Sequence, residues 1–141
     1  MTFARKADGQ RGEALAEAFL AERGFLVVAR NWTHRLGEID LIVERDGEIR
    51  FIEVKYRNTL MFGYPEEAVT GKKLRHLSRA IECWLEEQVR PPMRYQVDVV
   101  AITAVAGQPV DYHWVEDVYQ YSLVLAEILH KGIDPVRSGR F

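Results

Sequence analysis

Residues 37–55 read GEIDLIVERDGEIRFIEVK and contain two strand-like segments on either side of Asp46-Gly47. Together the two segments are rich in Ile, Val, Leu and Phe, and most of these residues favour β-strands. Asp-Gly between two such segments is the strongest short-range signal for a two-residue hairpin turn. The stretch therefore predicts two antiparallel strands, over residues 38–44 and 48–56.

The register of this hairpin follows from its turn. With Asp46-Gly47 as the two turn residues, Asp40 faces Glu53 on the neighbouring strand. Two residues further from the turn, Glu38 faces Lys55. Side chains alternate between the two faces of a sheet. One face is expected to carry Asp40, Ile42, Phe51, Glu53 and Lys55, and the other Ile39, Leu41, Ile52 and Val54.

Two carboxylates that face each other in a sheet repel unless their charge is neutralised. Asp40 and Glu53 therefore share a proton or hold a cation between them. Oxygen ligands without nearby Cys or His favour Mg²⁺ or Mn²⁺. Lys55 can orient an attacking water or neutralise charge on a phosphate. The plainer alternative is a solvated strand face on which Glu38 and Lys55 form an ordinary ion pair.

The rest of the chain predicts helices and strands around this hairpin. Residues 9–23 have helical apolar spacing and end at Gly24. Residues 70–89 form a second amphipathic helix that begins at Thr70 and stops before Pro91-Pro92. Further strands are expected over residues 25–32, 94–103 and 110–115, and a last amphipathic helix over residues 116–131. The pattern predicts an α/β fold.

Composition restricts the class of protein. The 141 residues fit one domain, expected over residues 1–131 with a loose tail at 132–141. No apolar run is long enough to span a membrane, and no secretory signal opens the chain. One cysteine, Cys83, excludes an intrachain disulfide and suits a cytoplasmic location. One cysteine and four scattered histidines also argue against a zinc site.

Several motifs in order resemble a known family. GEIDLI at residues 37–42 and FIEVK at residues 51–55 resemble the D…ExK core of the restriction-endonuclease-like, or PD-(D/E)xK, superfamily. The nearest resemblance is to the YraN family of small bacterial proteins, which looks related to archaeal Holliday-junction resolvases. It runs from about residue 9 to about residue 119 and implies a mixed central sheet of about five strands flanked by helices. Further matches are G-x-x-x-E-x-x-A-x-x-F-L at residues 9–20, Arg30-Asn31, Val69-Thr70 and RYQVDVV at residues 94–100.

The resemblance also implies a role for each matching position. Asp40 and Glu53 would bind the metal together with the backbone carbonyl of Val54, and Lys55 would be the catalytic lysine. Glu13 would match the glutamate that resolvase-like members bring to the metal from their first helix. Judged without the resemblance, Glu13 is an ordinary surface residue of a helix.

Asp98 matches a family position without a role that the sequence defines. It is either a further polar contact in the site or the partner of Arg94 or Lys55.

Candidate nucleic-acid contacts lie after the ExK motif and at the start of the second long helix. The net charge is −2, with a small excess of Lys and Arg in residues 1–79. A polyanion is therefore expected to meet the N-terminal part. A helix start also favours anions, although the same residues suit a solvated helix face. The candidates for phosphate contact are Arg57, Lys72, Lys73 and Arg75.

The leading functional hypothesis is a Mg²⁺- or Mn²⁺-dependent endonuclease. DNA is favoured over RNA, with branched DNA as the first substrate to test. The helix expected at residues 116–131 either packs on its own sheet or forms a homodimer contact. The alternative is a nucleic-acid-binding protein with little or no catalysis, which the net acidity favours. The intact set of Glu13, Asp40, Glu53 and Lys55 favours the enzyme.

Overall fold

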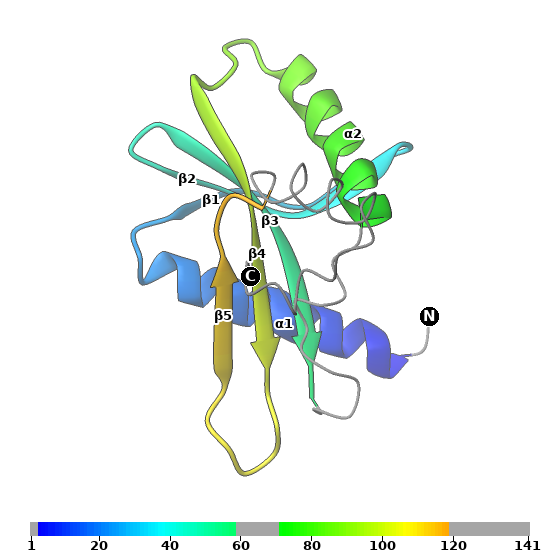
Figure 1. Ribbon diagram of the computed structural model, residues 1–141, viewed down its shortest axis with the longest axis vertical. Coiled ribbons are helices and arrows are strands. Elements are labelled where there is room, and N and C mark those ends of the chain that lie inside the picture. Colours follow the sequence, from blue (N-terminus) through cyan, green and yellow to red (C-terminus); the bar gives the residue numbers. More distant parts are fainter. Residues whose placement is uncertain (1–2, 59–70, 119–141) are drawn as a thin grey trace, which may run out of the picture.

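A five-stranded mixed sheet lies between two helices in the computed structural model (Figure 1). The backbone is described for residues 3–58 and 71–118, and side chains for residues 8–58 and 75–118. This architecture confirms the predicted α/β fold. The elements are α1 (Phe3–Ala21), β1 (Leu26–His34), β2 (Gly37–Arg45), β3 (Glu48–Arg57), α2 (Gly71–Glu87), β4 (Arg94–Thr103) and β5 (Asp111–Val115).

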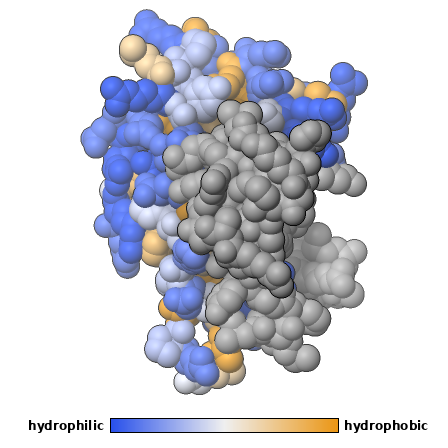
Figure 2. Space-filling view, viewed as in Figure 1, coloured by the Kyte–Doolittle hydropathy of each residue, from blue (hydrophilic) through white to orange (hydrophobic). Residues whose placement is uncertain are grey.

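The strand order is the order along the chain, from β1 to β5. Strands β3 and β4 are parallel, and the other neighbours are antiparallel. Two parallel neighbours need a crossover connection, and α2 lies in it. Within the described residues, no helix is long and apolar enough to cross a membrane. On the left side of Figure 2 the described residues form a mostly hydrophilic surface.

Each face of the sheet has its own buried core. The core on the α2 side is centred on Phe51, which packs edge-on against Trp84 of α2. The core on the α1 side contains Leu20 of α1 together with Leu41 and Ile52. Both cores follow from the alternation of apolar residues along β3.

The hairpin register was predicted correctly near the turn and wrongly further from it. Strands β2 and β3 pair from Arg45–Glu48 to Leu41–Ile52, as the Asp-Gly turn requires. The ladder ends there, so Asp40 is not cross-strand paired with Glu53. The same holds for the expected pair of Glu38 and Lys55.

The alternation of side chains between the two faces of the sheet is also interrupted in β2, at the point where β2 separates from β3. The prediction placed Ile39 on the same face as Leu41. Instead, Ile39 packs in the α2-side core together with Ile42. Ile39 and Leu41 therefore point to opposite faces, although they are two residues apart. The residue between them is Asp40.

The expected last helix does not begin at Glu116. Residues 116–118 are not helical, and Asp117 has a φ of 51°, which a right-handed helix does not allow. The backbone N–H of Val118 instead donates to the carbonyl of Val97 on β4, at 2.8 Å. The remainder of that prediction, and the tail, lie outside the described residues.

Helix α1 packs unusually close to β3 at one glycine. A Cβ atom added to Gly12 would lie 2.7 Å from the Cβ of Tyr56, whereas one added to Gly9 meets nothing within 4 Å. This close approach holds Glu13, the next residue of α1, near the end of β3.

The two glycines give a matched test of this packing. We expect Gly9→Ala to stabilise the protein by up to about 1 kcal/mol, because Ala favours a helix more than Gly does. Gly12→Ala gains the same propensity but forces α1 away from Tyr56, which costs about 1–3 kcal/mol and leaves a net loss of up to about 2 kcal/mol. Chemical denaturation of both variants measures the difference. Equal stabilisation by the two substitutions would contradict the close contact.

Candidate active site

Asp40 lies at the point where β2 and β3 separate. Its Oδ2 accepts a hydrogen bond from the backbone N–H of Val54, at 2.8 Å. The last backbone pair between the two strands is Leu41–Ile52, and just beyond it the N–H of Val54 is satisfied by a side-chain carboxylate. This bond ties Asp40 to the strand that carries Glu53 and Lys55, and it brings the predicted D and ExK motifs together.

The environment of Asp40 opposes its negative charge. Burial, followed by the charge of Glu53, raises the pKa of Asp40 from 3.8 to about 7. The hydrogen bond from Val54 lowers this pKa, Glu13 raises it further, and Lys55 lowers it. The negative charges of Glu53 on β3 and Glu13 on α1 therefore both act on the partly buried Asp40 of β2.

Glu53 and Lys55 form an ion pair on β3, with Nζ of Lys55 3.0 Å from Oε1 of Glu53. Their side chains are only partly exposed, at 22% and 18%. The two residues lie on the same side of the strand, as their spacing predicts. The lysine is thus held directly beside the acidic pair.

Glu13 is oriented by a residue whose role the sequence did not define. Asn31 of β1 donates from Nδ2 to Oε2 of Glu13, at 2.9 Å. Asn31 has a φ of 48°, a left-handed conformation that Asn tolerates better than most residues. One turn further along α1, Glu17 accepts two hydrogen bonds from Arg30, which lower its pKa. The Arg30-Asn31 motif therefore attaches β1 to the acidic side of α1.

A cleft of about 490 Å³ opens at Asp40 and Glu53. One wall is the turn between β1 and β2, and the other is α2. His34 comes from the first wall and His76 from the second, and no motif in the sequence signals that these two residues line one cleft. The cleft is lined by Thr33, His34, Arg35, Leu36, Gly37, Glu38, Asp40, Glu53, His76 and Leu77.

The predicted phosphate contacts are only partly placed by the structure. Arg57 ends β3 and is partly buried, and Arg75 is exposed on α2. The side chains of Lys72 and Lys73 lie outside the described residues.

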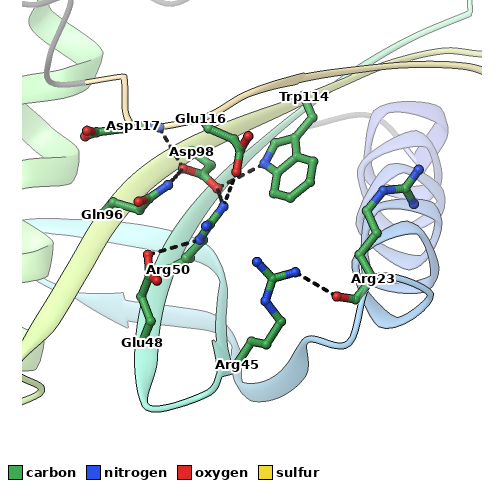
Figure 3. A network of polar contacts seen from close by, with 9 residues as sticks. All are labelled: Arg23, Arg45, Glu48, Arg50, Gln96, Asp98, Trp114, Glu116 and Asp117. Atoms are coloured by element: carbon green, nitrogen blue, oxygen red, sulfur yellow. Dashed lines mark hydrogen bonds and ion pairs between the residues drawn. The ribbon is translucent and has the colours of Figure 1, made fainter.

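Asp98 is not a contact of the acidic site. It is fully buried on β4 and accepts four hydrogen bonds, none from Arg94 or Lys55 (Figure 3). Both expected partners were wrong, because alternation along the parallel pair β3–β4 places Asp98 beside Arg50. The four donors are Nη1 of Arg50 at 3.0 Å, Nε1 of Trp114 at 2.9 Å, Nε2 of Gln96 at 2.9 Å and the backbone N–H of Asp117 at 2.8 Å.

Arg50 is surrounded by three carboxylates in this network. Besides Asp98, its Nη1 contacts Glu116 at 2.5 Å, and its Nε lies 3.4 Å from Glu48 without hydrogen-bond geometry. The network joins β3, β4 and the segment after β5.

The donor set at Asp40 suits a hard divalent cation. No three Asp, Glu, His or Cys side chains converge as a complete ligand set within the described part of the chain. Mg²⁺ does not require such a set, because it typically binds one or two carboxylates and keeps several waters. A partly buried carboxylate beside two others is a place where a cation would relieve repulsion. Asp40, Glu53 and the Val54 carbonyl therefore fit the ion, with Glu13 nearby.

Comparison with known proteins identifies the family. The family model described as "Uncharacterised protein family UPF0102" matches residues 12–102, more than half of the chain. The chain belongs to family UPF0102. This confirms the resemblance to the YraN family. The UPF0102 match includes Glu13, Asp40, Glu53 and Lys55, so the candidate site lies inside the shared region.

Relatives of this family cover most of the chain. A UPF0102 protein of Caldicellulosiruptor saccharolyticus is 37% identical over 112 residues, which are 79% of this chain and 95% of the relative. One of Nocardia farcinica is 43% identical over 110 residues, or 77% and 87% of the two chains. One of Beutenbergia cavernae is 45% identical over 100 residues, or 70% and 84%.

Proposed function

We propose that the chain hydrolyses phosphodiester bonds in nucleic acid, with DNA as the first substrate class to test. The observation that carries the proposal is that Asp40 and Glu53 line an open cleft, with Lys55 paired to Glu53 and the charge of Glu13 acting on Asp40. A structural role does not explain why a partly buried Asp40 is held where the charges of Glu53 and Glu13 oppose its ionisation, since such opposition lowers stability.

Mg²⁺ or Mn²⁺ would be held by Asp40, Glu53 and the Val54 carbonyl, with Glu13 completing the acidic side. When bound, the cation supplies an activated water and charge neutralisation at the phosphate. Lys55, oriented by Glu53, offers a positive charge to the oxygens of the phosphodiester as negative charge develops there. Asn31 acts by positioning Glu13.

A cleavage screen tests this function. Purified protein is incubated with Mg²⁺, Mn²⁺ or EDTA and with labelled single-stranded, duplex and four-way-junction DNA, and with RNA of the same sequence. Cleavage should require the metal. Asp40→Asn and Lys55→Ala should each reduce the rate by about 10²–10³-fold, the range found when one charge-stabilising group is removed.

The control is Asp46→Asn, the same chemical change in the exposed hairpin turn. It should cleave at the wild-type rate. Binding of nucleic acid without any metal-dependent cleavage would instead support the second candidate, a binding protein of the same fold. Cleavage that survives both site substitutions would assign the activity to a contaminant.

A further inference from the structure

The cleft beside the acidic site has two walls that are held together at Gly37. A Cβ atom added to Gly37 would lie 2.7 Å from the carbonyl oxygen of His76 and 3.3 Å from the Cβ of Ala80. The turn between β1 and β2 therefore rests directly on α2. This contact brings His34 from the turn and His76 from α2 to the same cleft.

His34 is held in one orientation by two contacts. Its ring stacks on Trp32, with centroids 5.8 Å apart and planes 5° apart. Its Nδ1 accepts a hydrogen bond from the backbone N–H of Leu36, at 3.2 Å. A neutral imidazole that accepts at Nδ1 carries its proton on Nε2. His34 is thus a pre-oriented donor, and a donor held in place loses little entropy when it binds a ligand.

The lining of the cleft combines two kinds of group. Asp40 and Glu53 are suited to a cation, whereas His34, Arg35 and His76 are donors suited to an anion. A nucleic-acid strand meets both needs when a cation lies between the acidic pair and one phosphate, because its phosphates repeat along the chain and each carries a negative charge. Because the acidic pair and the donors line one cleft, a strand that lies in it can meet the acidic pair with one phosphate and the donors with another.

We propose that His34, aided by Arg35 and His76, binds the phosphate next to the one cleaved. The inference rests on the proposed function and adds a substrate subsite to it. The subsite positions the strand, so that the scissile phosphate lies against Asp40 and Glu53. His34 is a binding residue and takes no part in breaking the bond.

The test is a binding cycle that pairs protein variants with neutralised phosphates. His34→Phe keeps an aromatic ring for Trp32 and removes the donor, and His34→Gln keeps a donor without the imidazole. Fluorescence anisotropy with Ca²⁺ in place of Mg²⁺ or Mn²⁺, at fixed low salt, measures the affinity for labelled DNA oligonucleotides and for RNA of the same sequence, because Ca²⁺ also takes oxygen ligands. In each oligonucleotide a single phosphate is replaced by an uncharged methylphosphonate.

We expect His34→Phe to bind the unmodified DNA about tenfold more weakly, the usual effect of losing a hydrogen bond to a charged group. At one position, the methylphosphonate should weaken DNA binding by the wild type about tenfold. The same replacement should not weaken DNA binding by His34→Phe any further. His34→Gln should keep part of that sensitivity. The control is His113→Ala on β5. Its affinity should change with each methylphosphonate position in the same way as that of the wild type.

Failure of this inference differs from failure of the proposed function. If wild type and His34→Phe respond equally at every position, the subsite is wrong even if the protein cleaves DNA. If the wild type binds neither DNA nor RNA, the proposed function and the subsite both fall. If His34→Phe does not fold, Arg35→Ala, an exposed residue of the same wall, undergoes the same cycle. An unchanged response would then overturn the subsite.

Discussion

Asp98→Asn is expected to lower the free energy of unfolding by about 3–5 kcal/mol, the cost of breaking a buried charge pair. Both carboxylate oxygens of Asp98 accept two hydrogen bonds each. Asn has the same size but replaces one oxygen by an NH₂ group. That group would face two donors, and the guanidinium of Arg50 would lose a carboxylate partner while only 7% exposed.

The measurement is denaturation by urea, with the slope compared between the variants. Asp46→Asn is the matched control, because Asp46 is exposed in the hairpin turn, where Asn also tolerates a φ of 53°. It should change stability by less than about 0.5 kcal/mol. A loss of under 1 kcal/mol for Asp98→Asn would show that Glu48 and Glu116 suffice for Arg50.

Asp40→Asn should have the opposite effect on stability. At pH 8 in EDTA we expect the variant to be more stable than the wild type, on the order of 2–4 kcal/mol. The wild type must then hold an ionised Asp40 that is partly buried beside Glu53 and Glu13. Asn carries no charge, and its side-chain oxygen can still accept the hydrogen bond from Val54.

The pH dependence follows from the direction of the shift. The pKa of Asp40 is about 7 in the folded protein and 3.8 as its ordinary value. Between these two values the folded state binds a proton that the unfolded chain releases, so folding gains stability at low pH and loses it as the pH rises to 7. The advantage of Asp40→Asn should therefore be absent near pH 4, grow up to pH 7 and stay constant above it.

Thermal melts across this pH range, with and without Mn²⁺, measure both effects. A cation that binds only the folded state stabilises the protein by mass action. Mn²⁺ should raise the melting temperature of the wild type at pH 8 and should hardly change that of Asp40→Asn. A variant that is less stable at pH 8, with an unchanged response to Mn²⁺, would make Asp40 a structural residue.

Local sequence determined the hairpin and most of the elements. Asp46-Gly47 specified a two-residue turn, and the register near it followed because pairing is counted outward from the turn. Strand β4 was predicted with its observed bounds, Arg94–Thr103. Alternation also placed Phe51, Glu53 and Lys55 on one side of β3, and the structure shows that α2 packs on this side at Phe51. These features depend on neighbours within a few residues along the chain.

Only the tertiary structure decided how the site is assembled. Counting from the turn could not show that the β2–β3 ladder ends after Leu41, or that Asp40 then accepts the N–H of Val54. The partner of Asp98 depended on the parallel register of β3 and β4, which a helix separates along the chain. The place of His34 and His76 in one cleft depended on the contact between Gly37 and α2. Such contacts join residues that are distant in sequence. They depend on how whole helices and strands pack, and local propensity carries no information about that packing.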